Sequence, residues 1–207
     1  MSNNITAIVD YGVGNLFSLK SSLQAIGAEA VITSNAYELL SAARIILPGV
    51  GAFEDAMNKL VSSGADKAVL ACANNGKPLL GICLGMQMLF DESFEYGCHK
   101  GLGLIPGKVV PLKDKIAADL KVPHIGWNSL DYKPDDALFK YLNGKAYAYY
   151  VHSYFADTPN EYIIASSEYG YKVTGAVRNN NVLGAQFHPE KSGKQGLLML
   201  KAFCEEV

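Results

Sequence analysis

The sequence contains no apolar run close to the roughly 18 to 20 residues that a membrane-spanning helix needs. Its first residues, MSNNITAIVDYG, carry no positively charged segment and pass directly into a strand-like pattern, which is not typical of a secretory signal. We therefore expect a protein that works in the cytoplasm and has no membrane partner.

An excess of charge of either sign is also lacking. The 18 basic and 20 acidic residues are mixed along the chain and give a net charge of −2. Without a basic block, neither nucleic acid nor an anionic membrane surface is an expected partner. Small neutral or zwitterionic substrates remain open.

Cysteines are few and irregularly spaced. The absence of a CxxC pair argues against both a zinc site and a disulfide scaffold. We expect free thiols and no bound metal. The four cysteines are Cys72, Cys83, Cys98 and Cys204.

A complete phosphate-binding loop is missing as well. The segment DYGVGNL at 10–16 lies between a predicted strand and a predicted helix, where such a loop would be placed. It lacks the third glycine of a dinucleotide fingerprint and the GK[ST] of a P-loop, so no cofactor is expected. We interpret the segment as a tight turn, or alternatively as a loop that contacts a partner protein.

Hydrophobic residues are abundant, at 49% of the 207 residues. This number is enough to form the core of one α/β domain, which we expect over 1–207. In the first part of the chain, short apolar strands alternate with helical stretches, which predicts a parallel sheet covered on both faces. Strands are predicted at 5–10, 30–34, 43–49 and 78–83, and helices at 15–27, 36–42, 52–62 and 65–75.

After about residue 100 the composition changes. Segments rich in Val, Ile and aromatic residues, separated by turn signals such as the asparagines at 179–181, predict largely antiparallel strands that extend or flank the parallel sheet. The fold class is thus α/β, a mostly parallel open sheet with helices on both faces and an antiparallel extension. One such segment is GLGLIPGKVVPL at 101–112. A last helix is predicted at about 192–206, with Leu197, Leu198, Leu200 and Phe203 toward the core.

Cys83 lies at a predicted strand-to-helix corner in the stretch LLGICLGMQMLF. With Gly81 and Gly85 it has the form of a G-x-S-x-G nucleophile elbow in which cysteine replaces serine. Sites in open α/β sheets gather at the carboxyl ends of parallel strands, and a helix N-terminus favours thiolate over thiol. The pattern alone leaves two interpretations open, a nucleophile or a buried cysteine that only packs.

A cysteine nucleophile needs a base held by a third group, and N–H donors for an oxyanion. His188 follows an apolar strand and Glu190 comes two residues later, so the carboxylate can orient the imidazole; a simple helix-entry turn is an equal alternative. The amide of Leu84, next to the nucleophile, is one predicted oxyanion donor. The segment 46–57 offers Gly51 as the second, although its glycines could serve only a turn into a helix.

The motifs PGVGAF, GICLGMQ and QFHPEKS occur in the order and with the separations found in the class I glutamine amidotransferases, which this chain resembles over essentially its full length. The resemblance implies the flavodoxin-like fold of that family. Within the family, the segments DYGVGN, PHIGWN and VHSYF resemble those of the glutaminase subunits of imidazole glycerol phosphate synthases.

The resemblance implies a cysteine-based hydrolysis of glutamine. Cys83 would attack the side-chain amide carbon of L-glutamine, form a glutamyl thioester and release ammonia, and water would then hydrolyse the thioester. His188 would act as acid and base in turn, with Glu190 orienting it. The amides of Leu84 and Gly51 would stabilise the oxyanion.

The resemblance also implies a substrate site. Gln87 matches a glutamine-contacting position of the family, Glu95 would attract the ammonium group of the substrate, and the backbone at Ser153 and Tyr154 would receive its carboxylate. Each has a plainer alternative: Gln87 on a helix surface, Glu95 as a solvated charge, and 152–154 as an ordinary strand segment.

Glutaminase subunits of this kind dock on a separate (β/α)8-barrel cyclase, which uses the ammonia to form imidazole glycerol phosphate for histidine biosynthesis. The resemblance therefore implies a heterodimer with such a cyclase. Asn15, Trp127 and Lys191 are the interface candidates, with a core position as the alternative for Trp127. Two other functions are weighed: a glutaminase serving another synthase, such as those for anthranilate, guanylate or pyridoxal phosphate, and a non-catalytic interaction module.

Overall fold

The computed structural model describes residues 4–207. The first three residues of the N-terminal segment MSNNITAIVDYG, which is not expected to be a secretory signal, lie outside the described residues. The strands of its larger sheet are β1 (Thr6–Val9), β2 (Ala30–Thr33), β3 (Arg44–Gly49), β4 (Leu79–Cys83), β8 (His124–Tyr132), β9 (Ala146–His152), β11 (Ile163–Glu168), β12 (Lys172–Asn179) and β13 (Val182–Ala185). A smaller sheet consists of β5 (Glu92–Ser93), β6 (His99–Lys100), β7 (Lys108–Pro111) and β10 (Tyr154–Asp157).

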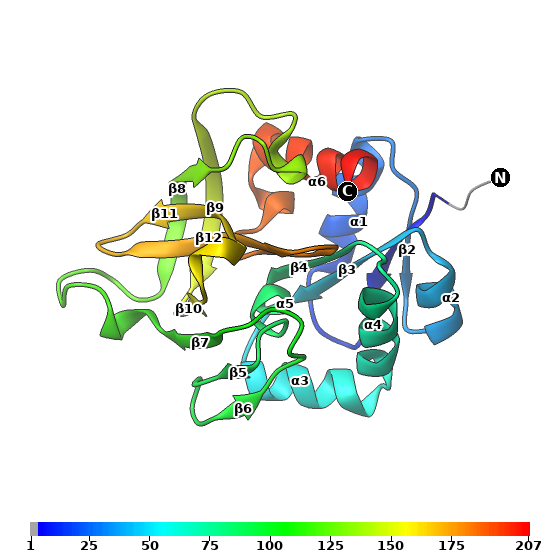
Figure 1. Ribbon diagram of the computed structural model, residues 1–207, viewed down its shortest axis with the longest axis horizontal. Helices are drawn as coiled ribbons and strands as arrows, with labels where there is room; N and C mark the ends of the chain where they lie inside the picture. The colour runs from blue at the N-terminus through cyan, green and yellow to red at the C-terminus, as the bar shows by residue number, and fades with distance from the viewer. Residues whose placement is uncertain (1–3) are drawn as a thin grey trace.

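The α-helices of the described chain are α1 (Leu16–Ala25), α2 (Ala36–Ser41), α3 (Phe53–Ser62), α4 (Ala65–Asn74), α5 (Leu84–Gln87) and α6 (Gly193–Glu206). Short 3₁₀ helices are η1 (Leu112–Asp114), η2 (Ala137–Phe139), η3 (Asn160–Tyr162) and η4 (Pro189–Lys191). In Figure 1 the N-terminal elements and the strands of the second half lie at opposite sides of the molecule.

The parallel part of the sheet is confirmed. Strand β1 pairs in parallel with both β2 and β3, and β3 pairs in parallel with β4. The order of the larger sheet is β2-β1-β3-β4-β13-β12-β11-β8-β9. Because all these N-terminal strands run the same way, their carboxyl ends meet at one edge, where ligands of open α/β sheets bind.

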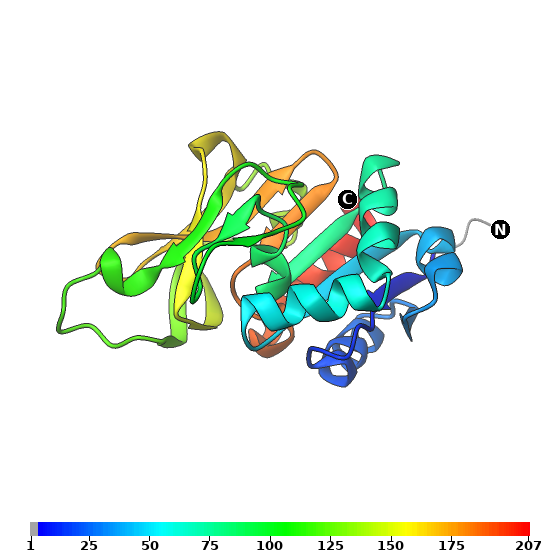
Figure 2. The same ribbon diagram turned by 90° about the horizontal axis from the view of Figure 1, so that it is seen from below.

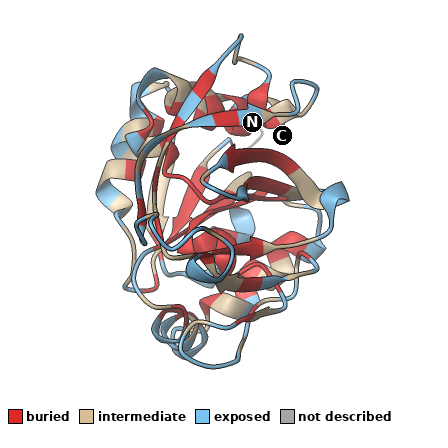
Figure 3. Cartoon of the chain, turned by 90° about the vertical axis from the view of Figure 1, so that its left-hand side faces the viewer, coloured by how far each residue is buried: buried red, intermediate tan, exposed pale blue. Residues whose placement is uncertain are grey.

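Helices cover both faces of the sheet, as expected (Figure 2). Along β1 the side chains alternate between two hydrophobic clusters, because successive residues of a strand point to opposite faces. Val9 packs in the cluster that includes Phe53 of α3, whereas Ile8 packs in the cluster that includes Leu19 of α1 and Phe203 of α6. The buried residues accordingly concentrate in the central strands and on the inner sides of the helices (Figure 3).

The second half is largely antiparallel, as predicted. Strands β8, β9, β11 and β12 extend the larger sheet, and strands β10, β7, β5 and β6 form the separate four-stranded sheet. Two features differ from the prediction. Strand β13, from the same segment as His188, lies inside the larger sheet and pairs in parallel with β4. Of the segment 101–112, only β7 is a strand, because 101–107 is an irregular connection in which Gly107 has a φ of +136°.

Two local expectations were wrong. The helix after Cys83 is the single turn α5, which has too few aligned peptides for the macrodipole that we invoked. In α6, Leu197 and Leu198 are only half-buried, and Met199 takes the core position beside Leu200 and Phe203.

Among residues 4–207, no helix combines the length and apolarity required to cross a membrane.

Candidate active site

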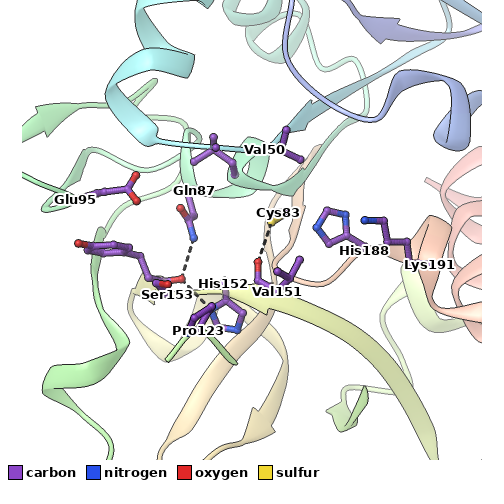
Figure 4. Close-up of a pocket in the computed structure, with 13 residues that line it drawn as sticks. Val50, Cys83, Gln87, Glu95, Pro123, Val151, His152, Ser153, His188 and Lys191 are labelled. Atoms are coloured by element: carbon purple, nitrogen blue, oxygen red, sulfur yellow. Dashed lines mark hydrogen bonds between the residues drawn. The ribbon is translucent and has the colours of Figure 1, made fainter. Parts of the chain in front are cut away.

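A cavity of about 360 Å³ lies at the carboxyl ends of β3 and β4, facing the end of β9 (Figure 4). It collects residues from segments far apart in the sequence. The lining residues are Val50, Gly51, Cys83, Leu84, Gln87, Glu95, Pro123, Val151, His152, Ser153, Tyr154, His188 and Lys191. Of the residues predicted for the site, Glu190, Asn15 and Trp127 are outside this lining.

Cys83 occupies a strained corner at the end of β4. Its φ is +55° and its ψ is −111°, a conformation that non-glycine residues rarely adopt. The glycines around it are needed for clearance: a Cβ on Gly81 would lie 2.6 Å from the carbonyl oxygen of Gly85, and one on Gly85 would lie 1.9 Å from that of Leu47. The elbow geometry predicted from the sequence is therefore present.

The Cys83 thiol is buried but opens to the cavity. Its Sγ lies 3.9 Å from the carbonyl oxygen of Val151 and 4.0 Å from Nε2 of Gln186. His188 is placed on the opposite side of Cys83 from Gln87 (Figure 4). The sulfur of Cys83 thus lies near both the imidazole of His188 and the side-chain amide of Gln186.

His188 is held by Glu190 in the way the spacing suggested. Nδ1 of His188 lies 2.8 Å from Oε1 of Glu190, and both side chains are 4% exposed. Nε2 of His188 is buried and has no hydrogen-bond partner among the described residues. Burial alone would lower the pKa of His188, but the neighbouring Cys83 and Glu190 outweigh it and raise that pKa to about 9. The imidazole is therefore poised to carry a proton next to the thiol.

Gln87 lies one turn beyond Cys83, and its side chain is buried, not exposed on a helix surface. Its Nε2 donates to the carbonyl oxygen of Tyr154 at 2.9 Å and to Oε1 of Gln186 at 3.1 Å. Gln186 was not predicted, although it immediately precedes the FHPE sequence on the same segment as His188. The carbonyl of Val151 was also missed, because a backbone contact leaves no signal in residue type.

Glu95 is half-buried and lines the cavity, so the description of a freely solvated charge does not fit it. Its Oε2 accepts a hydrogen bond of 2.5 Å from the backbone N–H of Phe53, the first residue of α3. A carboxylate at this position complements the positive end of the helix. Glu95, which follows β5 of the smaller sheet, therefore links that part of the chain to the start of α3.

Gly51 and Leu84, the predicted oxyanion donors, both line the cavity. Gly51 has a φ of +92°, which favours glycine, and a Cβ there would meet nothing within 4 Å. Val50, its half-exposed neighbour, lines the cavity too and was not singled out from the sequence. The loop between β3 and α3 thus brings two consecutive residues beside Cys83.

The three interface candidates are exposed. Asn15 lines a small recess that also contains Glu190 and that shares Val50 and His188 with the lining of the cavity. Trp127 is 57% exposed and meets Tyr149 edge-on, so a core position for it was wrong. Lys191 lies at the rim of the cavity (Figure 4).

Among residues 4–207, no group of three or more histidine, cysteine, aspartate or glutamate side chains has the arrangement of a metal site. The four cysteines have no disulfide partners. The arrangement that remains is a nucleophile, a base and an orienting carboxylate beside backbone donors, which suits acyl transfer through a covalent intermediate.

Comparison with known proteins gives consistent results. The family model described as glutamine amidotransferase class-I matches residues 7–207. The chain is 50% identical over 198 residues to the imidazole glycerol phosphate synthase subunit HisH of Listeria monocytogenes serotype 4a (strain HCC23), covering 96% of this chain and 94% of that protein. It is 48% identical over 203 residues to the corresponding HisH subunit of Wolinella succinogenes, covering 97% and 99%.

A solved structure of PurLQS from Thermotoga maritima has the same fold, with a TM-score of 0.75 at 18% identity and 98% of each chain covered. By its family model and by its relatives, this chain belongs to the class I glutamine amidotransferase family and, within that family, to the HisH group.

Proposed function

We propose that this chain is a glutaminase subunit that hydrolyses L-glutamine to glutamate and ammonia, and that it supplies the ammonia to the cyclase of an imidazole glycerol phosphate synthase in histidine biosynthesis. Cys83 and His188 line one cavity, and Glu190 holds His188 from outside it; this arrangement carries the proposal. The names of relatives at 48% and 50% identity support the choice of synthase.

In the first step the Cys83 thiolate attacks the side-chain amide carbon of glutamine. The carbonyl oxygen becomes an oxyanion, which accepts hydrogen bonds from the amides of Leu84 and Gly51. The His188 imidazolium gives its Nε2 proton to the amide nitrogen, the C–N bond breaks and ammonia leaves. The product on the enzyme is a glutamyl thioester at Cys83.

In the second step water replaces ammonia. Neutral His188 takes a proton from the water through Nε2, and the resulting hydroxide attacks the thioester carbonyl. The oxyanion forms again at the same donors and the C–S bond breaks, which returns Cys83 to the thiolate. The new side-chain carboxylic acid releases its proton to solvent, and the product leaves as glutamate. Glu190 holds Nδ1 throughout, so Nε2 stays directed to the reacting atoms.

The substrate is held by groups around the cavity. We assign the ammonium group of glutamine to Glu95, its carboxylate to the backbone N–H groups of Ser153 and Tyr154, and a further substrate contact to Gln87. A carboxylate opposite an ammonium group and N–H donors opposite a carboxylate satisfy both ends of a zwitterion. The proposed contacts thus account for both charged ends of the substrate.

The partner is proposed to be a (β/α)8-barrel cyclase that binds in trans in the cytoplasm. Asn15, Trp127 and Lys191 are our candidates for its docking surface, because each is exposed and Asn15 and Lys191 adjoin the catalytic groups. A position next to the cavity suits a subunit that must receive ammonia before water dilutes it.

The proposal is tested by mixing the chain with a cyclase subunit of an imidazole glycerol phosphate synthase. Wild type should support cyclisation with glutamine, whereas Cys83→Ala should support it only with added ammonia while binding the cyclase normally. Glutamine-dependent cyclisation by Cys83→Ala would contradict the nucleophile assignment. A well-folded wild type that responds to an anthranilate or guanylate synthase and ignores the cyclase would contradict the choice of synthase.

A further inference from the structure

A line of side-chain hydrogen bonds runs from β8 to the wall of the cavity. Nδ2 of Asn128 lies 3.4 Å from Nε2 of His124, and Nδ1 of His124 lies 3.1 Å from Nε2 of His152. Nδ1 of His152 lies 2.9 Å from the carbonyl oxygen of Tyr154, the same oxygen that accepts from Gln87. The catalytic steps above use none of the first three residues.

The direction of every proton in this line follows from its outer end. Oδ1 of Asn128 accepts from the N–H of Ser129 at 2.8 Å, and Nδ2 donates to the carbonyl of Glu168 at 2.8 Å, which fixes the orientation of the amide. Because Nδ2 can only donate, Nε2 of His124 must accept. Nδ1 of His124 then donates to Nε2 of His152, whose Nδ1–H donates to Tyr154.

Both histidines are buried, His124 at 3% and His152 at 6% exposure. The His124 ring is stacked between Tyr150 and Tyr169, with ring centroids 4.9 and 4.0 Å away. Burial lowers the pKa of His124 to about 4 and, with a contribution from His124, lowers that of His152 to about 3. Both rings are therefore neutral at neutral pH. Each then has one N–H that donates and one nitrogen that accepts, as hydrogen bonds running in one direction along the line require.

The line ends on a residue whose backbone faces the cavity. Tyr154 lies opposite Pro111 in the antiparallel pair of β10 and β7, and the neighbouring bond runs from the N–H of Leu112 to the carbonyl of Ser153. In such a ladder, hydrogen-bonded and non-hydrogen-bonded pairs alternate, so Tyr154 belongs to the second kind. Its N–H and C=O consequently point away from β7, on the side of His152 and Gln87.

We propose that His124 and His152 are positioning residues for substrate binding. They fix the carbonyl of Tyr154, and because the N–H and C=O of one extended residue point the same way, they also fix its N–H. The inference rests on the proposed function, in which that N–H receives the carboxylate of glutamine. His124 acts only through His152, and neither residue touches the reacting atoms.

The first test reads the protons directly. Nitrogen-15 NMR of histidine-labelled protein at neutral pH should show both rings in the Nδ1–H form. An Nε2–H form at His152 would overturn the proposal, since the Tyr154 carbonyl would then lack its donor. This measurement needs no activity, so it does not depend on the identity of the substrate.

The second test compares His152→Leu with His152→Asn in the complex with the cyclase. The amide of asparagine places an N–H near the position of Nδ1, whereas leucine keeps the volume and loses the donor. We expect His152→Leu to raise KM for glutamine about tenfold with kcat within about threefold of wild type, and His152→Asn to restore KM to within about threefold. Equal KM values for His152→Leu and wild type, or for His152→Leu and His152→Asn, would overturn the proposal.

The third test examines dependence on His124. His124→Leu should raise KM for glutamine in the wild-type background. It should have no further effect in the His152→Asn background, where Nε2 of His152, the acceptor for His124, is gone. An equal effect in both backgrounds would overturn the order of the line.

If His152→Leu does not fold, Asn128→Asp serves instead: it replaces the outer donor by an acceptor and should raise KM for glutamine. A wild-type complex without glutaminase activity would count against the proposed function, whereas an active wild type with unaffected variants would count against this inference alone.

Discussion

Nδ1 of His188 lies 2.8 Å from Oε1 of Glu190, and the one residue between them in the sequence, Pro189, is buried. In this contact the Nδ1–H of His188 donates to the carboxylate, which leaves Nε2 free to face the thiol of Cys83. The other oxygen of Glu190, Oε2, is buried and has no hydrogen-bond partner among the described residues. Within the described residues, His188 is therefore the group that the negative charge of Glu190 acts on most directly, and this charge favours the imidazolium form.

Replacing Glu190 by glutamine should reduce catalysis without unfolding the protein. The amide keeps the shape, but it removes the charge that stabilises the imidazolium and can present an N–H to Nδ1, which selects the wrong tautomer. We expect kcat for glutamine hydrolysis to fall by about 10² to 10⁴, with a small change in KM. Steady-state kinetics of the complex, with circular dichroism as the check on folding, measures this; kcat within threefold of wild type would contradict the role.

The raised pKa of His188 predicts a specific dependence of stability on pH. Its pKa is about 9 in the folded protein against an ordinary value of 6.5, so folding favours the protonated form. The resulting contribution is fully present below about pH 6.5 and is lost as the pH rises through about 9. Urea unfolding of wild type and His188→Gln should therefore give a stability difference that shrinks from pH 6.5 to 9.5. A constant difference would show that His188 does not titrate in this range.

The elbow predicts that Gly85→Ala is severely destabilising. The added Cβ would lie 1.9 Å from the backbone oxygen of Leu47, and backbone cannot move aside without disrupting the pairing of β3 with β4. We expect a loss of roughly 3 kcal/mol or more in the free energy of unfolding. Gly76→Ala is the control: its φ is +77° but its Cβ would meet nothing within 4 Å, so about 1 to 2 kcal/mol of backbone strain is expected. Similar losses in the two variants, measured by urea unfolding, would refute the steric explanation.

Tyr11 joins the N-terminal loop to the segment that contains Gly51. Its buried hydroxyl donates to the carbonyl oxygen of Pro48 at 2.7 Å. Tyr11→Phe leaves that carbonyl without its donor and should lower the free energy of unfolding by about 1 to 2 kcal/mol. Tyr37→Phe, at a tyrosine that is 76% exposed, should change it by less than about 0.5 kcal/mol. Indistinguishable unfolding curves for wild type and Tyr11→Phe would contradict a structural contribution of this bond.

The sequence predicted those features that depend on local pattern. The apolar strands and the helical stripe containing Leu19 and Leu23 were recognisable because each element buries one face. Cys83 was recognisable because clearance at a strained corner requires glycine on both sides. The bounds of the first helices agree with the structure to within a residue or two.

What could not be predicted depends on contacts between distant segments. Gln186 and the carbonyl of Val151 lie near Cys83 only because β13 and β9 both end at the cavity. The parallel pairing of β13 with β4 also depends on the packing of the whole sheet. The short length of α5 is another such case, because the residues after Gln87 have helical propensity but the chain turns toward the smaller sheet.

The most direct test of the central claim is rapid-quench mass spectrometry of the complex during turnover of glutamine. The account predicts a transient glutamyl adduct on the peptide that contains Cys83, which disappears when glutamine is exhausted and is absent in Cys83→Ala. A wild-type complex that turns over glutamine at a normal rate without an adduct on that peptide, or with one on Cys72, Cys98 or Cys204, would contradict Cys83 as the nucleophile.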